Sequence, residues 1–139
     1  MADTTVQFEL VSPEQLILSE DVEMVVVPGG EGDFGVLPGH SPMISTVRPG
    51  VIHVFTDGGV SSRIFVAGGF AEVTESRCTV LAEEALSVDE IDRAEVEIDL
   101  ENAVEDLGGT DDPSEQKAAE NRAVTARAKL AAIDAPVYQ

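Results

Sequence analysis

The residue types that could do chemistry gather between Met24 and Gly50, where glycines and prolines alternate with acidic side chains, a histidine and a serine. His40 and Ser41 are adjacent, and a hydrolase uses this pair as base and nucleophile. The glycine that closes a nucleophile elbow is missing, however, and the strand-like surroundings are not the strand–turn–helix context that presents such a serine. The sequence therefore disfavours an acyl-transfer enzyme, although that alternative would predict reaction of Ser41 with a serine-directed probe.

The other chemical motifs in the chain are incomplete. The glycines from Gly29 to Gly35 could cradle a phosphate, but no Gly-Lys-Ser/Thr follows them, and Glu31 and Asp33 would repel phosphate. Two histidines and the single cysteine, Cys78, do not have the spacing of a zinc site, and the acidic residues near position 111 lack the alternating ligands of a calcium loop. We expect no catalytic residues, no metal and no cofactor.

Charge excludes two further classes of function. The 139 residues include 27 acidic and 8 basic side chains, a formal net charge of −19 that repels nucleic acid and anionic lipid headgroups. No tract approaches the ~20 apolar residues that span a bilayer, and the amino terminus lacks the pattern of a signal peptide. We therefore expect a soluble chain that binds no nucleic acid and does not insert directly into a membrane.

The elements that must position these residues change character at residue 87. Residues 1–86 contain many short runs rich in Val, Ile, Phe and Thr, separated by turn dipeptides such as Pro49-Gly50 and Asp57-Gly58, which is typical of an antiparallel β-sandwich. Within this part, the glycine-and-proline run from Pro28 to Pro42 predicts one shaped loop between two strands, and such loops often carry function. Residues 87–139 have helical periodicity and predict a two-helix hairpin.

Local signals predict the ends of the two helices. The run Ser87–Glu90 reads as a capping box, so the first helix is expected from about 88 to 107. This helix has two apolar stripes, one expected to face the sandwich and one expected to face the second helix. The first consists of Val88, Ile91, Ala94 and Ile98, and the second of Val96, Leu100, Ala103, Val104 and Leu107. Asp112-Pro113 is an N-cap followed by a first-turn proline, which predicts the start of the second helix. A narrow apolar seam should hold that second helix to the first, and its residues are Ala119, Ala123, Ala126, Leu130 and Ile133.

The central stretch also carries a resemblance to a known family. The pattern PGxxGxxGVLPGHxP, followed by Val66–Phe70 and by Val80–Glu83, resembles the epsilon subunit of F-type ATP synthases, which is called delta in mitochondria. The similarity is continuous over roughly residues 6 to 86. It implies an amino-terminal β-sandwich, a carboxy-terminal helical hairpin, and a non-catalytic place in the central stalk, where such subunits couple the gamma subunit to the ring of c subunits.

Carried over residue by residue, the resemblance implies two contact sites. Glu31 and Asp33 lie in the loop that faces the c ring, whose polar loops carry arginine in the family. His40, Pro42 and Met43 lie where such proteins meet gamma. The complex would sit peripherally on the cytoplasmic side of a bacterial inner membrane. The alternative is a free-standing β-sandwich adaptor that binds another basic protein.

The resemblance further implies a regulatory role for the hairpin. In many family members it extends along gamma toward the alpha and beta subunits and inhibits ATP hydrolysis, and the basic residues that could serve here are Arg93, Arg122, Arg127 and Lys129. Some relatives bind ATP on the hairpin through an aliphatic residue, Asp, two residues, Arg and Ala. Here three residues separate Asp89 from Arg93, which disfavours ATP binding.

Overall fold

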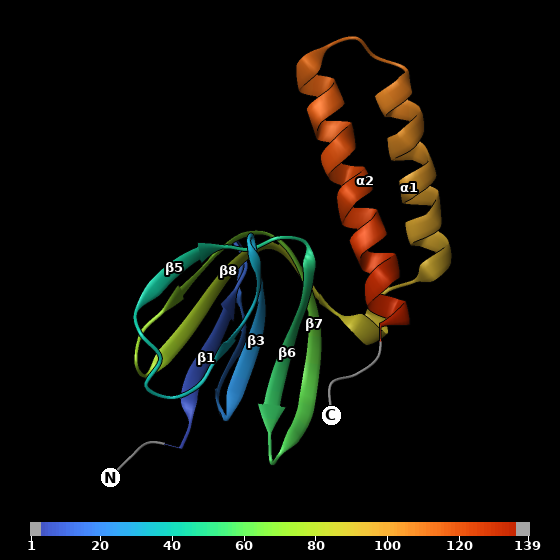
Figure 1. Ribbon diagram of the computed structural model, residues 1–139. Coiled ribbons are helices and arrows are strands. Elements are labelled where there is room, and N and C mark those ends of the chain that lie inside the picture. Colours follow the sequence, from blue (N-terminus) through green and yellow to red (C-terminus); the bar gives the residue numbers. More distant parts are fainter. Residues whose placement is uncertain (1–3, 136–139) are drawn as a thin grey trace.

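A computed structural model describes residues 4–135 as a β-sandwich with a two-helix hairpin standing against one side of it (Figure 1). The strands are β1 (Val6–Val11), β2 (Leu16–Val22), β3 (Met24–Gly29), β4 (Gly32–Val36), β5 (Met43–Thr46), β6 (Gly50–Thr56), β7 (Gly59–Val73) and β8 (Arg77–Ser87). A short 3₁₀ turn, η1 (Val88–Glu90), precedes α1 (Arg93–Gly108) and α2 (Pro113–Asp134). The fold class predicted from the sequence is confirmed, and the division expected between residues 86 and 87 lies one residue before the end of β8.

The strands form one continuous hydrogen-bonded path that folds over a single core. Their order is β2-β1-β8-β7-β6-β3-β4, and β5 pairs with β7. Strands β1 and β8 run parallel, with Phe8 opposite Cys78, and the other pairings of named strands are antiparallel. Alternate side chains of each strand point inward, and Phe8, Leu10 and Ile52 are among the largest fully buried side chains.

The expectation of one shaped loop from Pro28 to Pro42 is wrong, because a strand occupies its middle. Strand β4 pairs antiparallel with β3, and Gly30 and Glu31 form the tight turn between them. Phe34 and Val36 alternate inward along β4, and Val36 is fully buried. Burial of these two side chains explains why this part of the glycine-rich run forms a strand. The predicted loop is thus replaced by the tight turn at residues 30–31 and a second loop at residues 37–42.

The first helix begins later than the capping-box signal predicts. Ser87 makes no side-chain cap and instead ends β8, where its backbone pairs with Ile64. The true cap is Asp92, whose carboxylate accepts hydrogen bonds from the backbone N–H groups of Ala94 and Glu95. The cap predicted for the second helix is confirmed, since Asp112 accepts from the N–H of Ser114 at 3.0 Å.

Helix α1 faces α2 rather than the sandwich. Its buried residues, Val96 and Ala103, lie against α2, as predicted. Of the stripe expected to face the sandwich, Val88 and Ile91 precede α1 and do pack beside Phe65. Ala94 and Ile98 are exposed, so their predicted contact with the sandwich is wrong. The alanines of the predicted seam on α2 are buried, while Leu130 and Ile133 are only partly buried. The difference arises because the carboxy-terminal part of α2 turns a different face, carrying Ala128 and Ala132, to the sheet.

Candidate functional site

The β3–β4 turn forms a tip that is held by an arginine from a neighbouring segment. Arg48 donates from Nη1 to the carbonyl oxygen of Gly29 at 2.6 Å and from Nη2 to Oδ1 of Asp33 at 2.5 Å. Glu31 is exposed at the apex and has no ion pair or hydrogen bond within residues 4–135. Of the two carboxylates predicted to face a c ring, one is therefore paired inside the chain and the other points to solvent.

The structure separates the two predicted contact sites. Glu31 lies at one end of β4 and the loop with His40 and Pro42 at the other, and four residue steps along a strand span roughly 13 Å. The second loop is tied to the β7–β8 turn by a hydrogen bond from the N–H of Gly39 to the carbonyl oxygen of Glu75 at 2.8 Å. The sequence analysis expected the acidic residues, His40 and Pro42 within one loop.

Within the second loop, the residues predicted to contact gamma point in different directions. Pro42 is exposed and His40 is half-buried, whereas Met43 opposes Val73 in the β5–β7 pair and packs against the sandwich core. The His40 Nδ1 atom lies 2.7 Å from the backbone carbonyl oxygen of Ser41. The imidazole thus contacts a main-chain oxygen, not a serine hydroxyl.

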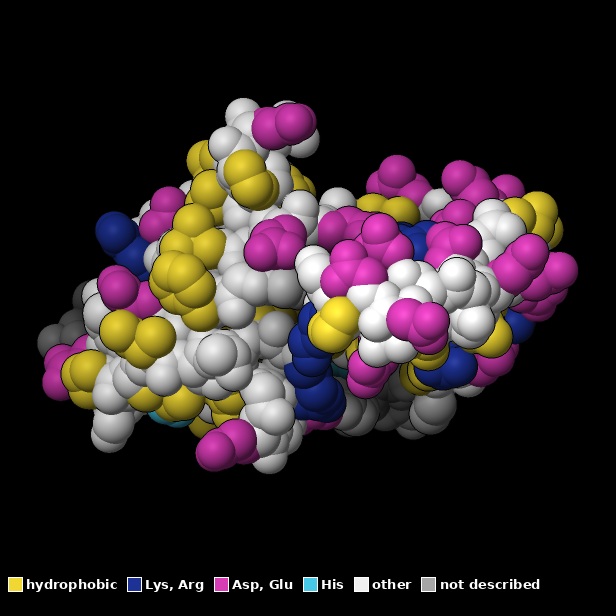
Figure 2. Space-filling model, turned by 90° about the horizontal axis from the view of Figure 1, so that it is seen from above, with side chains coloured by type: hydrophobic (Ala, Val, Ile, Leu, Met, Phe, Trp, Pro, Cys, Tyr) yellow, Lys and Arg dark blue, Asp and Glu magenta, His cyan; other side chains and the backbone are white. Residues whose placement is uncertain are grey.

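A row of apolar side chains, which we call the apolar row, crosses the outer face of the sandwich. Phe70 lies opposite Leu81, Leu81 opposite Val11, and Val11 opposite Leu16, so four neighbouring strands contribute in register. Ile44 of β5 extends the row diagonally, because Thr46 of the same face opposes Phe70. The exposed members are Ile44 (71%), Leu16 (56%), Phe70 (47%) and Leu81 (38%). Figure 2 shows hydrophobic side chains gathered over the sandwich and acidic ones over the hairpin.

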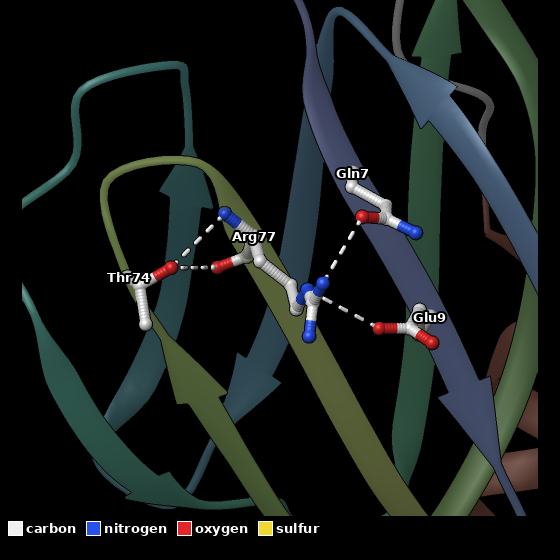
Figure 3. Close-up of polar contacts among 4 residues, drawn as sticks. All are labelled: Gln7, Glu9, Thr74 and Arg77. Carbon is white, nitrogen blue, oxygen red and sulfur yellow. Dashed lines mark hydrogen bonds and ion pairs between the residues drawn. The ribbon is translucent and has the colours of Figure 1, made fainter.

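Polar side chains border the apolar row on the same face. Arg77 pairs with Glu9 at 3.3 Å and donates to Oε1 of Gln7 at 3.4 Å, and its backbone N–H donates to the hydroxyl of Thr74 at 3.1 Å (Figure 3). Gln7 and Glu9 alternate with core residues of β1, so they share the outer face with Val11. An apolar centre with a polar border is the usual arrangement of a protein-binding surface.

The hairpin rests on the outer side of β6 and of the first half of β7. Phe65 is fully buried beneath α2 with Ala132, and Lys129 lies 5.7 Å above the Phe65 ring while its Nζ pairs with Glu84 at 2.5 Å. Arg63 donates to the carbonyl oxygen of Ala132 at 3.0 Å, which satisfies an orphan carbonyl at the end of the helix. One aromatic ring and two cations are thus part of this contact.

The basic residues predicted to regulate are mostly paired in this folded hairpin. Arg93 forms an ion pair with Asp134, Arg122 pairs with Asp106 at 2.8 Å, and Lys129 pairs with Glu84. Arg127 is exposed.

His53 was not singled out by the sequence, yet it is nearly buried between the sheet and α2. It opposes Arg63 in the β6–β7 pair and lines a shallow groove with Ala128 and Ala132. Burial, reinforced by the positive charge of Arg63, lowers the pKa of His53 below its usual 6.5, against an opposing effect of Asp33. The neutral imidazole is therefore the form that suits the docked hairpin.

Two further observations bear on the class of protein. Across residues 4–135, no three His, Cys, Asp or Glu side chains are grouped so that they could hold a metal ion. In the same part of the chain, neither helix is both long and apolar enough to cross a bilayer.

The sequence of the sandwich matches a known class of subunit. Residues 5–88 match the family model described as "ATP synthase, Delta/Epsilon chain, beta-sandwich domain". The chain belongs to this family, as the sequence motif predicts.

Named relatives narrow the membership to the epsilon type. The chain is 56% identical to the ATP synthase epsilon chain of Rhodospirillum centenum over 135 residues, which cover 94% of this chain and 92% of the relative. It is 54% identical to that of Rhodospirillum rubrum over 132 residues, or 95% and 98% of the two chains. Its fold matches a chain of the Euglena gracilis mitochondrial ATP synthase with a TM-score of 0.84, at 24% identity and covering 96% and 84% of the two chains.

Proposed function

We propose that this chain is a central-stalk subunit that couples gamma to the c ring of an ATP synthase and has no catalytic residues of its own. Family membership makes it a subunit of such a complex. The observation that carries the proposal is the pair of separate outward surfaces, the apolar row and the Glu31 tip, on one stiff sandwich. A subunit that joins two neighbours needs two such surfaces. Its place would be peripheral, on the cytoplasmic side of a bacterial inner membrane.

The apolar row is the surface that we assign to gamma. Ile44, Phe70 and Leu81 present contiguous apolar area, and an exposed apolar patch with a polar border marks a protein interface. His40 and Pro42 lie in the loop just before β5 and extend the same surface. Met43 supports it from the core side, because it packs inward while Ile44 points outward.

The Glu31 tip is the surface that we assign to the c ring. Glu31 is exposed at a tight turn, and the paired Asp33 lies two residues later in the same tip. A carboxylate suits the arginine-bearing loops that the family resemblance implies for the c ring, since an arginine offers two N–H groups to it.

The hairpin is proposed to regulate ATP hydrolysis by leaving the sandwich. Docking engages Lys129 in an ion pair with Glu84 of β8, whereas Arg93 and Arg122 pair with carboxylates across the two helices. Release from the sandwich would free Lys129, and separation of the two helices would free the two arginines for the alpha and beta subunits. The contact with the sheet is small, which favours release. We propose that this happens without bound ATP, because Arg122 and Lys129, which line the cavity between the hairpin and β8, already have carboxylate partners.

Reconstitution tests the two contacts separately. The full chain is added to an ATP synthase stripped of its own epsilon subunit, and co-purification of gamma and the c ring is measured. Ile44→Asp should abolish gamma binding, and Glu31→Gln should weaken c-ring retention while gamma stays bound. The matched control is Val104→Asp, at an exposed apolar residue of α1. Unaltered recovery of both partners with Ile44→Asp and Glu31→Gln would instead favour an adaptor for another basic protein.

Truncation tests the hairpin. The cut belongs after Ile91, because β8 pairs with β7 as far as Ser87 and Ile91 packs on the same cluster as Phe65. Loss of residues 92–139 should raise ATPase activity while gamma binding persists. Equal activity before and after truncation would remove the inhibitory role.

A further inference from the structure

The tip of the β3–β4 hairpin is fixed by contacts that come from outside the hairpin. Arg48 bonds to it three times: its backbone N–H donates to the carbonyl oxygen of Pro28 at 2.9 Å, Nη1 to that of Gly29, and Nη2 to the carboxylate of Asp33. These contacts reach both strands of the hairpin on either side of its turn. One guanidinium therefore holds β3 and β4 together just where Glu31 projects.

The turn itself packs closely on the end of β5, the strand that follows it in the chain. The N–H of Gly30 donates to the carbonyl oxygen of Thr46 at 2.9 Å, and Gly29 forms a bridge with Val47. A Cβ atom at Gly30 would lie 2.3 Å from Oγ1 of Thr46. The backbone of residues 46–48 thus packs against the turn, and the side chain of Arg48 bonds to the strands on both sides of it.

The two acidic residues of the tip have different surroundings as a result. The Asp33 carboxylate accepts from the Arg48 guanidinium at 2.5 Å, so its charge is balanced within the chain. Glu31 is exposed at the apex, and no contact holds it within residues 4–135. The tip therefore presents one unbalanced negative charge, in a position that the Arg48 contacts define.

We propose that Arg48 is the positioning residue of this tip, that Asp33 acts through Arg48, and that Glu31 alone of the two carboxylates contacts the basic partner. The proposal rests on the assignment of the tip to the c ring, and it reassigns Asp33 from contact to support. A tip that is already ordered loses less conformational entropy when it binds, so the arginine strengthens binding without touching the partner.

Salt dependence and a double-mutant cycle test the proposal in the reconstituted complex. Asp33→Asn, Arg48→Gln and Glu31→Gln are titrated against the c ring in detergent, in complex with gamma, at several salt concentrations. Asp33→Asn and Arg48→Gln should each weaken binding about 5-fold, as expected for loss of one exposed ion pair, and the double variant no more than either single one. Both should keep the salt dependence of the native chain, because they remove no charge that meets the partner.

Glu31→Gln should behave differently, with weaker binding and a shallower salt dependence. The proposal is overturned if Asp33→Asn flattens the salt dependence as Glu31→Gln does, or if the effects of Asp33→Asn and Arg48→Gln simply add. Thr110→Val, in the turn between α1 and α2 and away from the tip, is the control.

Amide hydrogen exchange on the free chain separates this proposal from the assignment of the partner. Asp33→Asn and Arg48→Gln should both accelerate exchange at residues 30–32, whereas Glu31→Gln should not. If no variant changes c-ring binding but exchange responds as expected, the tip is positioned by Arg48 and the partner assignment is wrong. If exchange at residues 30–32 is unchanged, Arg48 does not position the tip.

Discussion

Replacing Phe65 by alanine should release the hairpin while the sandwich stays folded. Phe65 is fully buried, but it lies on the outer face of β7 beneath α2, outside the main core. Its partners from α2 are Ala128 and Ala132, which bury little area of their own. Truncation of a buried phenylalanine costs about 3–5 kcal/mol, and the lower figure shifts the docking equilibrium roughly 100-fold. Lys129 also loses the ring below it.

Amide hydrogen exchange and calorimetry measure the two effects separately. In Phe65→Ala, exchange in residues 126–134 should rise by about the same 100-fold, while the unfolding temperature of the sandwich changes little. The matched control is Phe8→Ala, which removes an equally buried ring from the main core and should destabilise the sandwich itself. The reasoning is refuted if Phe65→Ala leaves the protection of α2 unchanged, or if it lowers the sandwich transition as much as Phe8→Ala.

Three further outcomes follow from individual residues. Because burial lowers the pKa of His53, the unfolded chain takes up its proton first, so stability should fall as pH drops below 6.5, and urea melts of His53→Gln should lack that component. Burial raises the pKa of Cys78 to about 12, so Ellman's reagent should not react at pH 8 until denaturant is added. A Cβ at Gly69 would lie 1.8 Å from a backbone carbonyl oxygen at a φ of +106°, so Gly69→Ala should lower the unfolding temperature sharply. Gly59→Ala, which meets nothing within 4 Å, should be tolerated in the same melts.

Local signals predicted the elements whose ends depend only on nearby residues. Asp112 caps α2 as expected, because the cap needs only its own carboxylate and the next turn of the helix. Ser87 offered an equally good signal and failed, since its backbone is committed to the pair with Ile64, 23 positions away in the chain. Because Ser87 is held in the sheet, α1 begins later than its sequence signal predicts, after the cap at Asp92.

The same distinction, between contacts that are local in the chain and contacts that are distant, applies to the candidate sites. Glu31 could be predicted as a contact residue because a motif of glycines and prolines surrounds it, and that motif lies in one continuous stretch. Arg48 was missed, although it lies in the same stretch, because its contact with Asp33 spans 15 positions and appears only when β3, β4 and the segment before β6 come together. His53 was not singled out, because its burial depends on the docking of α2 over β6.

By itself, the sequence determined the family, the change from strands to helices near residue 87, and the acidic character of the chain. These properties depend on composition, on periodicity and on one continuous motif. Only the tertiary structure decided which outer faces stay uncovered. The apolar row combines Phe70, Leu81, Val11 and Leu16 from four strands, and the pairing registers of those strands bring these residues side by side. Exposure is a property of what packs on a residue, and no local pattern records it.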